Sequence, residues 1–226
     1  MHYIELLKQI NNSTLTKDEA YIMQLEMLNA KLDPRLVSER SQGGASLSYI
    51  EAHSAYQILG AIFGVGNWKL DVQRLEETCR EKREKNGKDQ YVSGYSALCT
   101  LTVTFANGTT TSISDVGNGN SIDYQGFHST TEGAQKEAVS DAFKRCAKSL
   151  GNPLGLALYN KNKTMVGYSK FTVMLEDPDL DVVRGLATEN ESTKAQTKAY
   201  LESLSKTKLG ELSHSELQAL FSQLIS

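Results

Sequence analysis

Three basic residues near the end of a predicted long helix have the types and spacing best suited to a chemical task. Lys144 and Lys148 are four residues apart and share a helix face, and Arg145 lies about 100° round the axis from Lys144. Such a cationic edge would suit phosphate groups. The alternative is a solvated face on which Asp141 pairs with Lys144 and Arg145 for a few tenths of a kcal/mol. Spacing alone leaves both interpretations open.

Two further residues, Arg40 and Tyr49, precede and open a second predicted helix. A guanidinium group can hold a phosphate, and an aromatic ring can stack on a nucleic-acid base. Their positions alone are a weak signal for such a site.

The sequence gives little support for catalysis. Its 4 histidines are scattered, and only Glu51 and His53 place a carboxylate close to an imidazole, on different sides of a helix. A capping carboxylate beside a structural histidine explains this pair better than a metal site or a general base. The sequence contains no Gly-x-Ser-x-Gly elbow and no catalytic cysteine motif. We therefore expect no catalytic residue and no metal site.

Two glycine-rich segments, Gly64-Val65-Gly66 and residues 117–121, are not followed by the Gly-Lys-Ser/Thr that closes a Walker loop. We interpret both as turns and expect no nucleotide cofactor. Cys79, Cys99 and Cys146 are odd in number and far apart, which argues against a disulfide framework and a zinc site.

The composition is that of an ordinary globular protein and does not suggest a nucleic-acid ligand. The 226 residues carry a formal net charge of -3. Residues 176–226 hold 5 basic and 9 acidic side chains, which leaves 19 basic and 18 acidic for residues 1–175. A phosphate site must therefore be a local groove of focused charge. Because no apolar stretch could span a bilayer and residues 1–10 do not resemble a signal peptide, we expect a cytoplasmic protein.

Capping boxes predict two helices in the first part of the chain. Thr16 with Glu19 begins one that ends near residue 33, and Ser48 with Glu51 begins another that ends at Gly64.

Alternation of apolar and polar residues from Trp68 onward predicts a three-stranded antiparallel meander. Its turns would be Asn86-Gly87 and Asn107-Gly108, and its third strand would lie near residues 109–116. A glycine-rich loop over residues 117–126 would lead to a long helix that begins at Ser129 and packs on the sheet. The predicted fold class is α+β, with a β-β-β-α core and preceding helices.

We predict three parts along the chain. Residues 1–175 form the main domain, residues 176–191 an acidic linker, and residues 192–226 a small helical tail. The tail would hold two short helices over residues 193–204 and 213–225, the second begun by a Ser213 and Glu216 capping box.

Whole segments, in order, resemble the amino-terminal annealing domain of the Rad52 family from about residue 35 to residue 160. The first block comprises Ser38-Glu39-Arg40 with Gly43-Gly44, then Tyr49-Ile50-Glu51-Ala52-His53, then Phe63-Gly64 to Asn67-Trp68. The second comprises Asp115-Val116-Gly117-Asn118-Gly119 and the run from Lys136 to Arg145, continuing from Lys148 to Gly155.

This resemblance implies a curved sheet and a long helix that assemble side by side into a homo-oligomeric ring, with single-stranded DNA in an outer groove. It implies that Arg40, Lys144, Arg145 and Lys148 contact the phosphate backbone and that Tyr49 helps to shape the groove. The implied activity is annealing of complementary strands without ATP in homologous recombination and DNA repair. No enzymatic activity and no cofactor are implied.

The sequence departs from the family pattern in two places that bear on DNA binding. Lys148 stands where the family more often has Arg, which keeps the charge but loses the bidentate fork. The family's second, outer DNA site uses lysines, one of them in the loop after the Asp115-Val116-Gly117 segment, yet residues 121–131 contain neither Lys nor Arg. Lys88 would supply only one part of that site.

The family's long carboxy-terminal region, which recruits protein partners in eukaryotic members, is also absent, and such compactness suggests a phage, prophage or bacterial member. The acidic tail is expected to bind a protein partner, such as a single-stranded DNA-binding protein or a phage exonuclease. A helix pair that packs on the main domain or caps the ring is an equally good interpretation of the tail.

We therefore predict a protein that binds and anneals single-stranded DNA. One alternative is a module that binds duplex RNA or DNA without annealing it, which would depend on duplex shape. A less favoured alternative is an enzyme of unknown chemistry.

Overall fold

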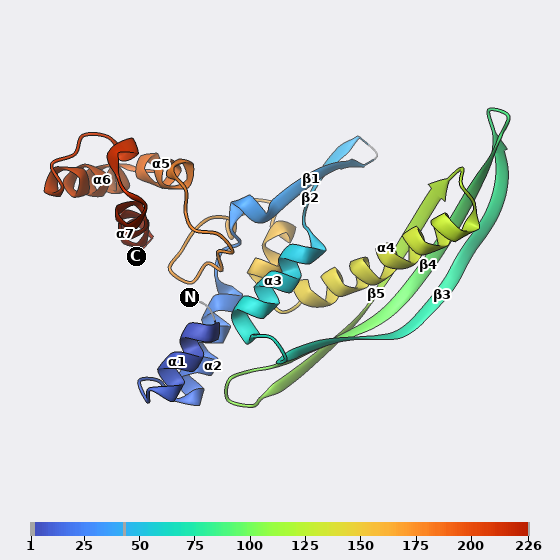
Figure 1. Ribbon diagram of the computed structural model, residues 1–226, viewed down its shortest axis with the longest axis horizontal. Coiled ribbons are helices and arrows are strands. Elements are labelled where there is room, and N and C mark those ends of the chain that lie inside the picture. The colour runs from blue at the N-terminus through green and yellow to red at the C-terminus, as the bar shows by residue number, and fades with distance from the viewer. Residues whose placement is uncertain (1–2, 43, 226) are drawn as a thin grey trace.

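The computed structural model describes residues 3–42 and 44–225, in which one long helix lies lengthwise on a long curved sheet (Figure 1). Gly43 of the Gly43-Gly44 motif lies outside the described residues. The α-helices are α1 (Tyr3–Asn11), α2 (Lys17–Asn29), α3 (Ala52–Phe63), α4 (Phe127–Lys148), α5 (Leu180–Thr188), α6 (Glu191–Ser203) and α7 (His214–Leu224). The strands are β1 (Val37–Gln42), β2 (Ala45–Ile50), β3 (Trp68–Lys85), β4 (Lys88–Thr104) and β5 (Thr110–Asp123). Short 3-10 turns are η1 (Pro34–Leu36), η2 (Asn152–Leu154), η3 (Leu156–Tyr159) and η4 (Leu209–Glu211).

The predicted meander is confirmed, because β3, β4 and β5 form one antiparallel sheet in that order. At its first turn Asn86 and Gly87 have φ of 53° and 71°, as a type I′ turn requires. At the second turn the positive φ is that of Gly108, 87°. The β3–β4 pairing contains two register shifts, between Val72 and Arg74 and between Glu77 and Cys79.

The third strand and the long helix both extend beyond the predicted limits. The glycine-rich segment predicted as a loop continues β5 to Asp123, and α4 begins at Phe127 rather than at Ser129. Gly117 and Gly119 are strand residues that lie beneath α4, where a Cβ atom on either would come closer than 3.0 Å to the helix backbone. These glycines therefore permit close contact between helix and strand, which explains why a turn interpretation was wrong.

Small residues on the helix side match those glycines. Ala134, Ala138 and Ala142 follow one another at intervals of four along α4 and are fully buried. Gly117 meets the backbone of Ala138 and Ala142, and Gly119 meets that of Ala134 and Ala138. The helix axis is thereby held close to β5 along several turns.

Two carboxylates of α4 bind the outer edge of β5. The Asn118 amide donates to Asp141 Oδ2 at 3.1 Å, and the Asn120 amide donates to Glu137 Oε2 at 2.7 Å. Glu137 and Asp141 are four residues apart and lie on one helix face, so both carboxylates can reach the edge of β5. These bonds fix the register of the helix on the strand.

The main core lies where α2, α3 and the C-terminal half of α4 meet the end of the sheet. Ile58, Ile62, Phe63 and Phe143 are fully buried there. Gln24 of α2 is also fully buried, and its amide donates to the Ile62 carbonyl and accepts from the Ala106 amide, both at 2.8 Å. These two bonds satisfy the amide and join α2 to α3 and to the β4–β5 turn.

The second predicted helix begins later than its proposed capping box. Ser48 belongs to β2, and α3 starts at Ala52 with Glu51 as an N-cap residue that makes no side-chain capping bond. Strands β1 and β2 pair as a two-stranded hairpin, whose register matches Ser38 with Tyr49 and Arg40 with Leu47. The first capping box, Thr16 with Glu19, is confirmed at α2.

The segment interpreted as a linker, residues 176–191, contains a helix that was not predicted, α5. Helices α5 and α7 bury Val183, Leu220 and Phe221 in a small core of their own. Tyr168 of the main domain contacts the Phe221 ring edge to face at 5.8 Å, and burial raises the pKa of its phenol to about 12. The two predicted helices and the Ser213 and Glu216 capping box are confirmed. Within the described residues no helix is long and apolar enough to cross a membrane.

The close contact of α4 with β5 makes Gly117→Ala a severe substitution. We expect a loss of about 3 kcal/mol in the free energy of unfolding, because the new methyl group must displace helix backbone rather than a mobile side chain. Urea unfolding measures this change. Gly60→Ala in α3, where nothing lies within 4 Å of the new Cβ, should instead stabilise the protein by about 0.5–1 kcal/mol. Equal effects of the two substitutions would contradict the proposed packing.

Candidate nucleic-acid interface

A groove of about 700 Å³ lies between the β1–β2 hairpin, the C-terminal end of α4 and the segment that follows α4. Four of the predicted phosphate ligands line it, together with the predicted aromatic residue. These five residues are Arg40, Tyr49, Lys144, Arg145 and Lys148. The structure therefore brings together side chains that lie up to 108 positions apart in the chain.

Two of these cations lie over the ring of Tyr49. The Arg40 Cζ atom lies 5.7 Å from the ring centroid and the Lys144 Nζ atom lies 5.5 Å from it. Both distances are within reach of a cation–π attraction, which a partly desolvated site strengthens. Arg40 and Tyr49 belong to the hairpin, so this contact also joins the hairpin to α4.

The Tyr49 hydroxyl is fixed by a neighbouring carboxylate. It donates to Glu51 Oε1 at 3.0 Å, and this hydrogen bond, with a smaller contribution from burial, raises the pKa of the phenol. Glu51 was interpreted as a helix-capping carboxylate, but its side chain orients Tyr49 instead. The ring is therefore held in one orientation under the two cations.

Arg145 is the most strongly paired cation of the groove. Its Nε donates to Asp141 Oδ2 at 2.9 Å, and this bond raises the pKa of the guanidinium group. Both side chains are partly exposed, so the pair itself contributes little stability. Because the same carboxylate oxygen accepts from Asn118, Asp141 holds Arg145 at a fixed place beside β5.

The segment after α4 contributes three residues that were not predicted from the sequence. Tyr159, Lys161 and Lys163 line the groove opposite the hairpin. Lys163 Nζ donates to Ser48 Oγ at 2.7 Å and lies 3.9 Å from Glu39 Oε1, so it joins this segment to the hairpin. The only signal in the sequence is the pair of lysines on either side of Asn162, just beyond the region of resemblance.

Charge is concentrated in this groove although the chain as a whole is acidic. Arg40, Lys144, Arg145, Lys148, Lys161 and Lys163 face it, against the two acidic residues Glu39 and Asp141. A concave surface lined by one sign of charge focuses the electrostatic potential. In the described part of the chain no cluster of His, Cys, Asp and Glu could hold a metal ion. The arrangement suits a polyanion bound through its phosphates.

Lys88 does not belong to this groove. It lies beside the β3–β4 turn, which Figure 1 shows at the far end of the sheet from the C-terminal end of α4. The structure thus separates Lys88 from the other predicted ligands.

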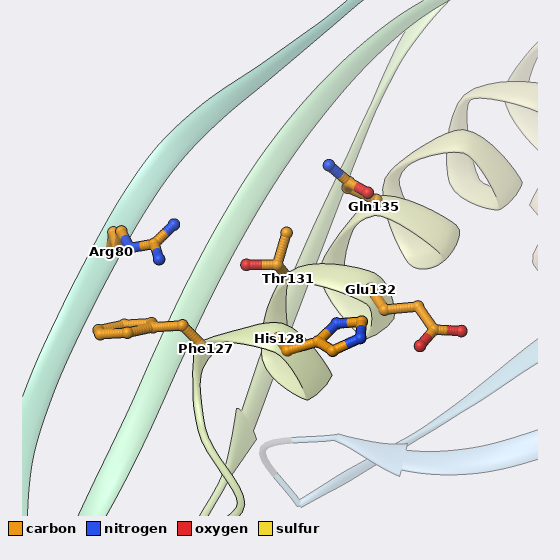
Figure 2. Close-up of a pocket in the computed structure, with 6 residues that line it drawn as sticks. All are labelled: Arg80, Phe127, His128, Thr131, Glu132 and Gln135. Carbon is orange, nitrogen blue, oxygen red and sulfur yellow. The ribbon is translucent and has the colours of Figure 1, made fainter.

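A second hollow, of about 470 Å³, lies near that far end, between β3 and the first turns of α4 (Figure 2). Arg80 of β3 stacks on Phe127 with its Cζ atom 4.3 Å from the ring centroid, and its Nη1 donates to Glu77 Oε2 at 3.2 Å. Glu132 and His128 complete the wall. With one arginine balanced by nearby carboxylates, this hollow lacks the charge excess of the groove.

Comparison with known proteins places most of the main domain in one family. Residues 22–172 match the family model described as "Rad52/22 family double-strand break repair protein". This region includes every element from η1 to η3 and all the residues that line the groove.

Named relatives support the same grouping. The DNA repair and recombination protein rad22 of Schizosaccharomyces pombe is 32% identical over 151 residues, which are 66% of this chain and 31% of the relative. The DNA repair and recombination proteins RAD52 of Candida glabrata and of Saccharomyces cerevisiae are 33% and 32% identical over 60% of this chain, and the matches cover 26% and 27% of those relatives. The chain thus matches less than a third of the length of these proteins.

The contact between Lys163 and the hairpin predicts a local effect on hairpin stability. Lys163→Met keeps the length of the side chain but removes its bond to Ser48, so the amides of residues 38–49 should exchange with solvent faster. Global stability should change by at most about 1 kcal/mol, because the partners are exposed. Native-state hydrogen exchange measures both quantities. Lys161→Met is the matched control, and equal hairpin exchange in the two variants would refute the bracing role of Lys163.

Proposed function

Because this chain belongs to the Rad52/22 family of double-strand break repair proteins, we propose that its groove binds single-stranded DNA and promotes annealing of complementary strands without ATP. Its relatives are DNA repair and recombination proteins. The observation that carries the proposal is the convergence of Arg40, Lys144, Arg145 and Lys148 with Tyr49 in one groove.

The chemistry of the groove suits a strand held by its backbone. Its ligands are mostly cationic groups, which neutralise phosphates without reading base identity. A strand bound in this way keeps its base edges accessible, and the repulsion that opposes a second strand is reduced. Base pairing then releases about 1.4 kcal/mol for each stacked step, so strand annealing needs no nucleotide cofactor.

Replacing two groove cations should slow annealing. The Lys144→Ala, Arg145→Ala double variant should anneal two labelled complementary strands roughly tenfold more slowly than the wild type, since two phosphate contacts are lost. Annealing followed by fluorescence transfer without ATP, at two salt concentrations, measures this change. Lys198→Ala, which removes an exposed lysine of α6 outside the groove, should behave as the wild type at both concentrations.

The same experiment separates the proposal from its alternatives. A folded wild type that binds duplex RNA or DNA better than single strands, and does not accelerate annealing, would support the duplex-binding module. Equal loss of activity in the Lys198→Ala variant would show that the loss does not come from the groove.

We further propose that copies of this chain assemble side by side into a ring. Helix α4 covers β4 and β5 but leaves the same face of β3 open, where Val72 and Leu75 are 47% and 38% exposed. On the opposite face of the sheet Val116 and Ile122 are 41% and 53% exposed. Two different apolar patches on opposite faces allow head-to-tail contacts, which form a ring when the rotation between copies closes.

Charged substitutions in either patch should reduce the oligomeric state. Leu75→Glu and Val116→Glu should each dissociate the assembly, because a carboxylate would be buried without a partner at the contact. Light scattering coupled to size-exclusion chromatography measures the molecular mass. Ile22→Glu on α2, at a residue that is 53% exposed and distant from both patches, is the control. A mass that is unchanged in both patch variants would exclude this mode of assembly.

The role of the tail stays a prediction. Its own small core supports a separate folded module, and the contact of Tyr168 with Phe221 supports a packed position against the main domain. The proposed partners are a single-stranded DNA-binding protein or an exonuclease. Deletion of residues 176–226 with no change in the binding of either protein would remove this prediction.

A further inference from the structure

We infer that Tyr159 is a positioning residue for Lys148, a role that rests on the proposed binding of single-stranded DNA in the groove. Lys148 Nζ donates a hydrogen bond to the Tyr159 hydroxyl at 3.0 Å and lies 4.4 Å from the centroid of its ring. The ammonium group therefore contacts both the phenolic oxygen and the ring of Tyr159. The shortest cation–ring distance of the groove is the one between these two side chains.

Tyr159 is placed by rigid backbone rather than by packing of its own side chain. It ends the 3-10 turn η3, which follows Gly155 in a left-handed conformation with φ of 104°. Leu154 and Ala157 on either side of Gly155 are buried at 1% and 2% exposure and fix the turn in the core. Tyr159 is 70% exposed, so it contributes little to the core. Its closest described side-chain contact is the one with Lys148.

The chemistry of lysine explains why such a partner matters at this position. An ammonium group is a point charge on a flexible stem, whereas the planar fork of arginine is preorganised for two parallel bonds to a phosphate. A bond to Tyr159 uses one of the three ammonium donors and leaves two for a phosphate. The ring also restricts the motion of the stem, which lowers the entropy lost when a phosphate binds. Tyr159 thus supplies part of the preorganisation that lysine lacks in comparison with arginine.

The other wall of the groove has a related but looser contact, without a hydrogen bond from the lysine to the tyrosine among the described residues. Lys144 lies over the ring of Tyr49, whose hydroxyl is oriented by Glu51. The two lysines, one turn apart on α4, are each supported by a tyrosine from a different segment. Their ammonium groups are therefore held at fixed places along the groove.

A direct role of Tyr159 would be stacking of its ring on a base, and a double-mutant cycle separates it from positioning. A stacking residue acts through the neutral base, so its removal leaves the dependence of affinity on salt unchanged. A residue that positions Lys148 acts through a phosphate contact, so its removal reduces the salt dependence and has no effect once Lys148 is gone.

The experiment is a titration of labelled oligothymidylate with the full chain by fluorescence anisotropy over a series of salt concentrations. Lys148→Gln and Tyr159→Leu should each weaken binding roughly three- to tenfold and reduce the salt dependence, and the double variant should resemble Lys148→Gln alone. Tyr159→Phe, which keeps the ring but loses the hydroxyl, should fall between the wild type and Tyr159→Leu. Lys148→Arg in the Tyr159→Leu background should restore the salt dependence.

The possible failures are distinguishable. If the wild type binds and Lys148→Gln weakens binding but Tyr159→Leu does not, the positioning role is wrong and the proposed function stands. If Tyr159→Leu weakens binding equally with and without Lys148, at unchanged salt dependence, Tyr159 stacks on bases instead. If the wild type shows no salt-dependent binding of single strands, the proposed function fails and this inference fails with it. Unchanged melting temperatures of the Tyr159 variants exclude misfolding as the cause.

Discussion

The close contact between α4 and β5 is the constraint on which the rest of the structure depends. Gly117 and Gly119 have no side chain that would separate the two elements. On the facing side, the buried alanines of α4 carry only a methyl group. The carboxylates of Glu137 and Asp141 then bind β5 amides and fix the helix rotation. Because the helix can neither rotate nor slide, its last two turns present Lys144, Arg145 and Lys148 to the hairpin.

The groove combines weak interactions in a way that suits reversible binding. Its ion pairs are exposed and contribute little to folding, so their cations can exchange a carboxylate or a ring for a phosphate at small cost. The tyrosines hold the lysines in place without neutralising them. A polyanion bound by such contacts would be held along its backbone and could still leave or shift easily.

The sequence predicted those features that depend on local patterns. The α+β order, the meander, the Asn86-Gly87 turn and the Thr16 capping box follow from spacing within a few residues, and they are confirmed. The β1–β2 hairpin and the full length of β5 were missed, since serine and glycine in these strands resemble caps and turns unless their tertiary neighbours are known. Lys161 and Lys163 reach the groove through the path of the chain after α4, which no local pattern indicates.

The two edges of the sheet are protected from strand addition in different ways. This protection affects how the protein behaves at high local concentration. On β5 the amides of Asn118 and Asn120 are already bound by side chains of α4. On β3 the register shifts and a dense row of charged residues make a poor template for another strand. Neither edge therefore invites strand-by-strand addition of the kind that builds fibrils. Crowded copies of this chain therefore have little tendency toward amyloid-like growth through the sheet edges.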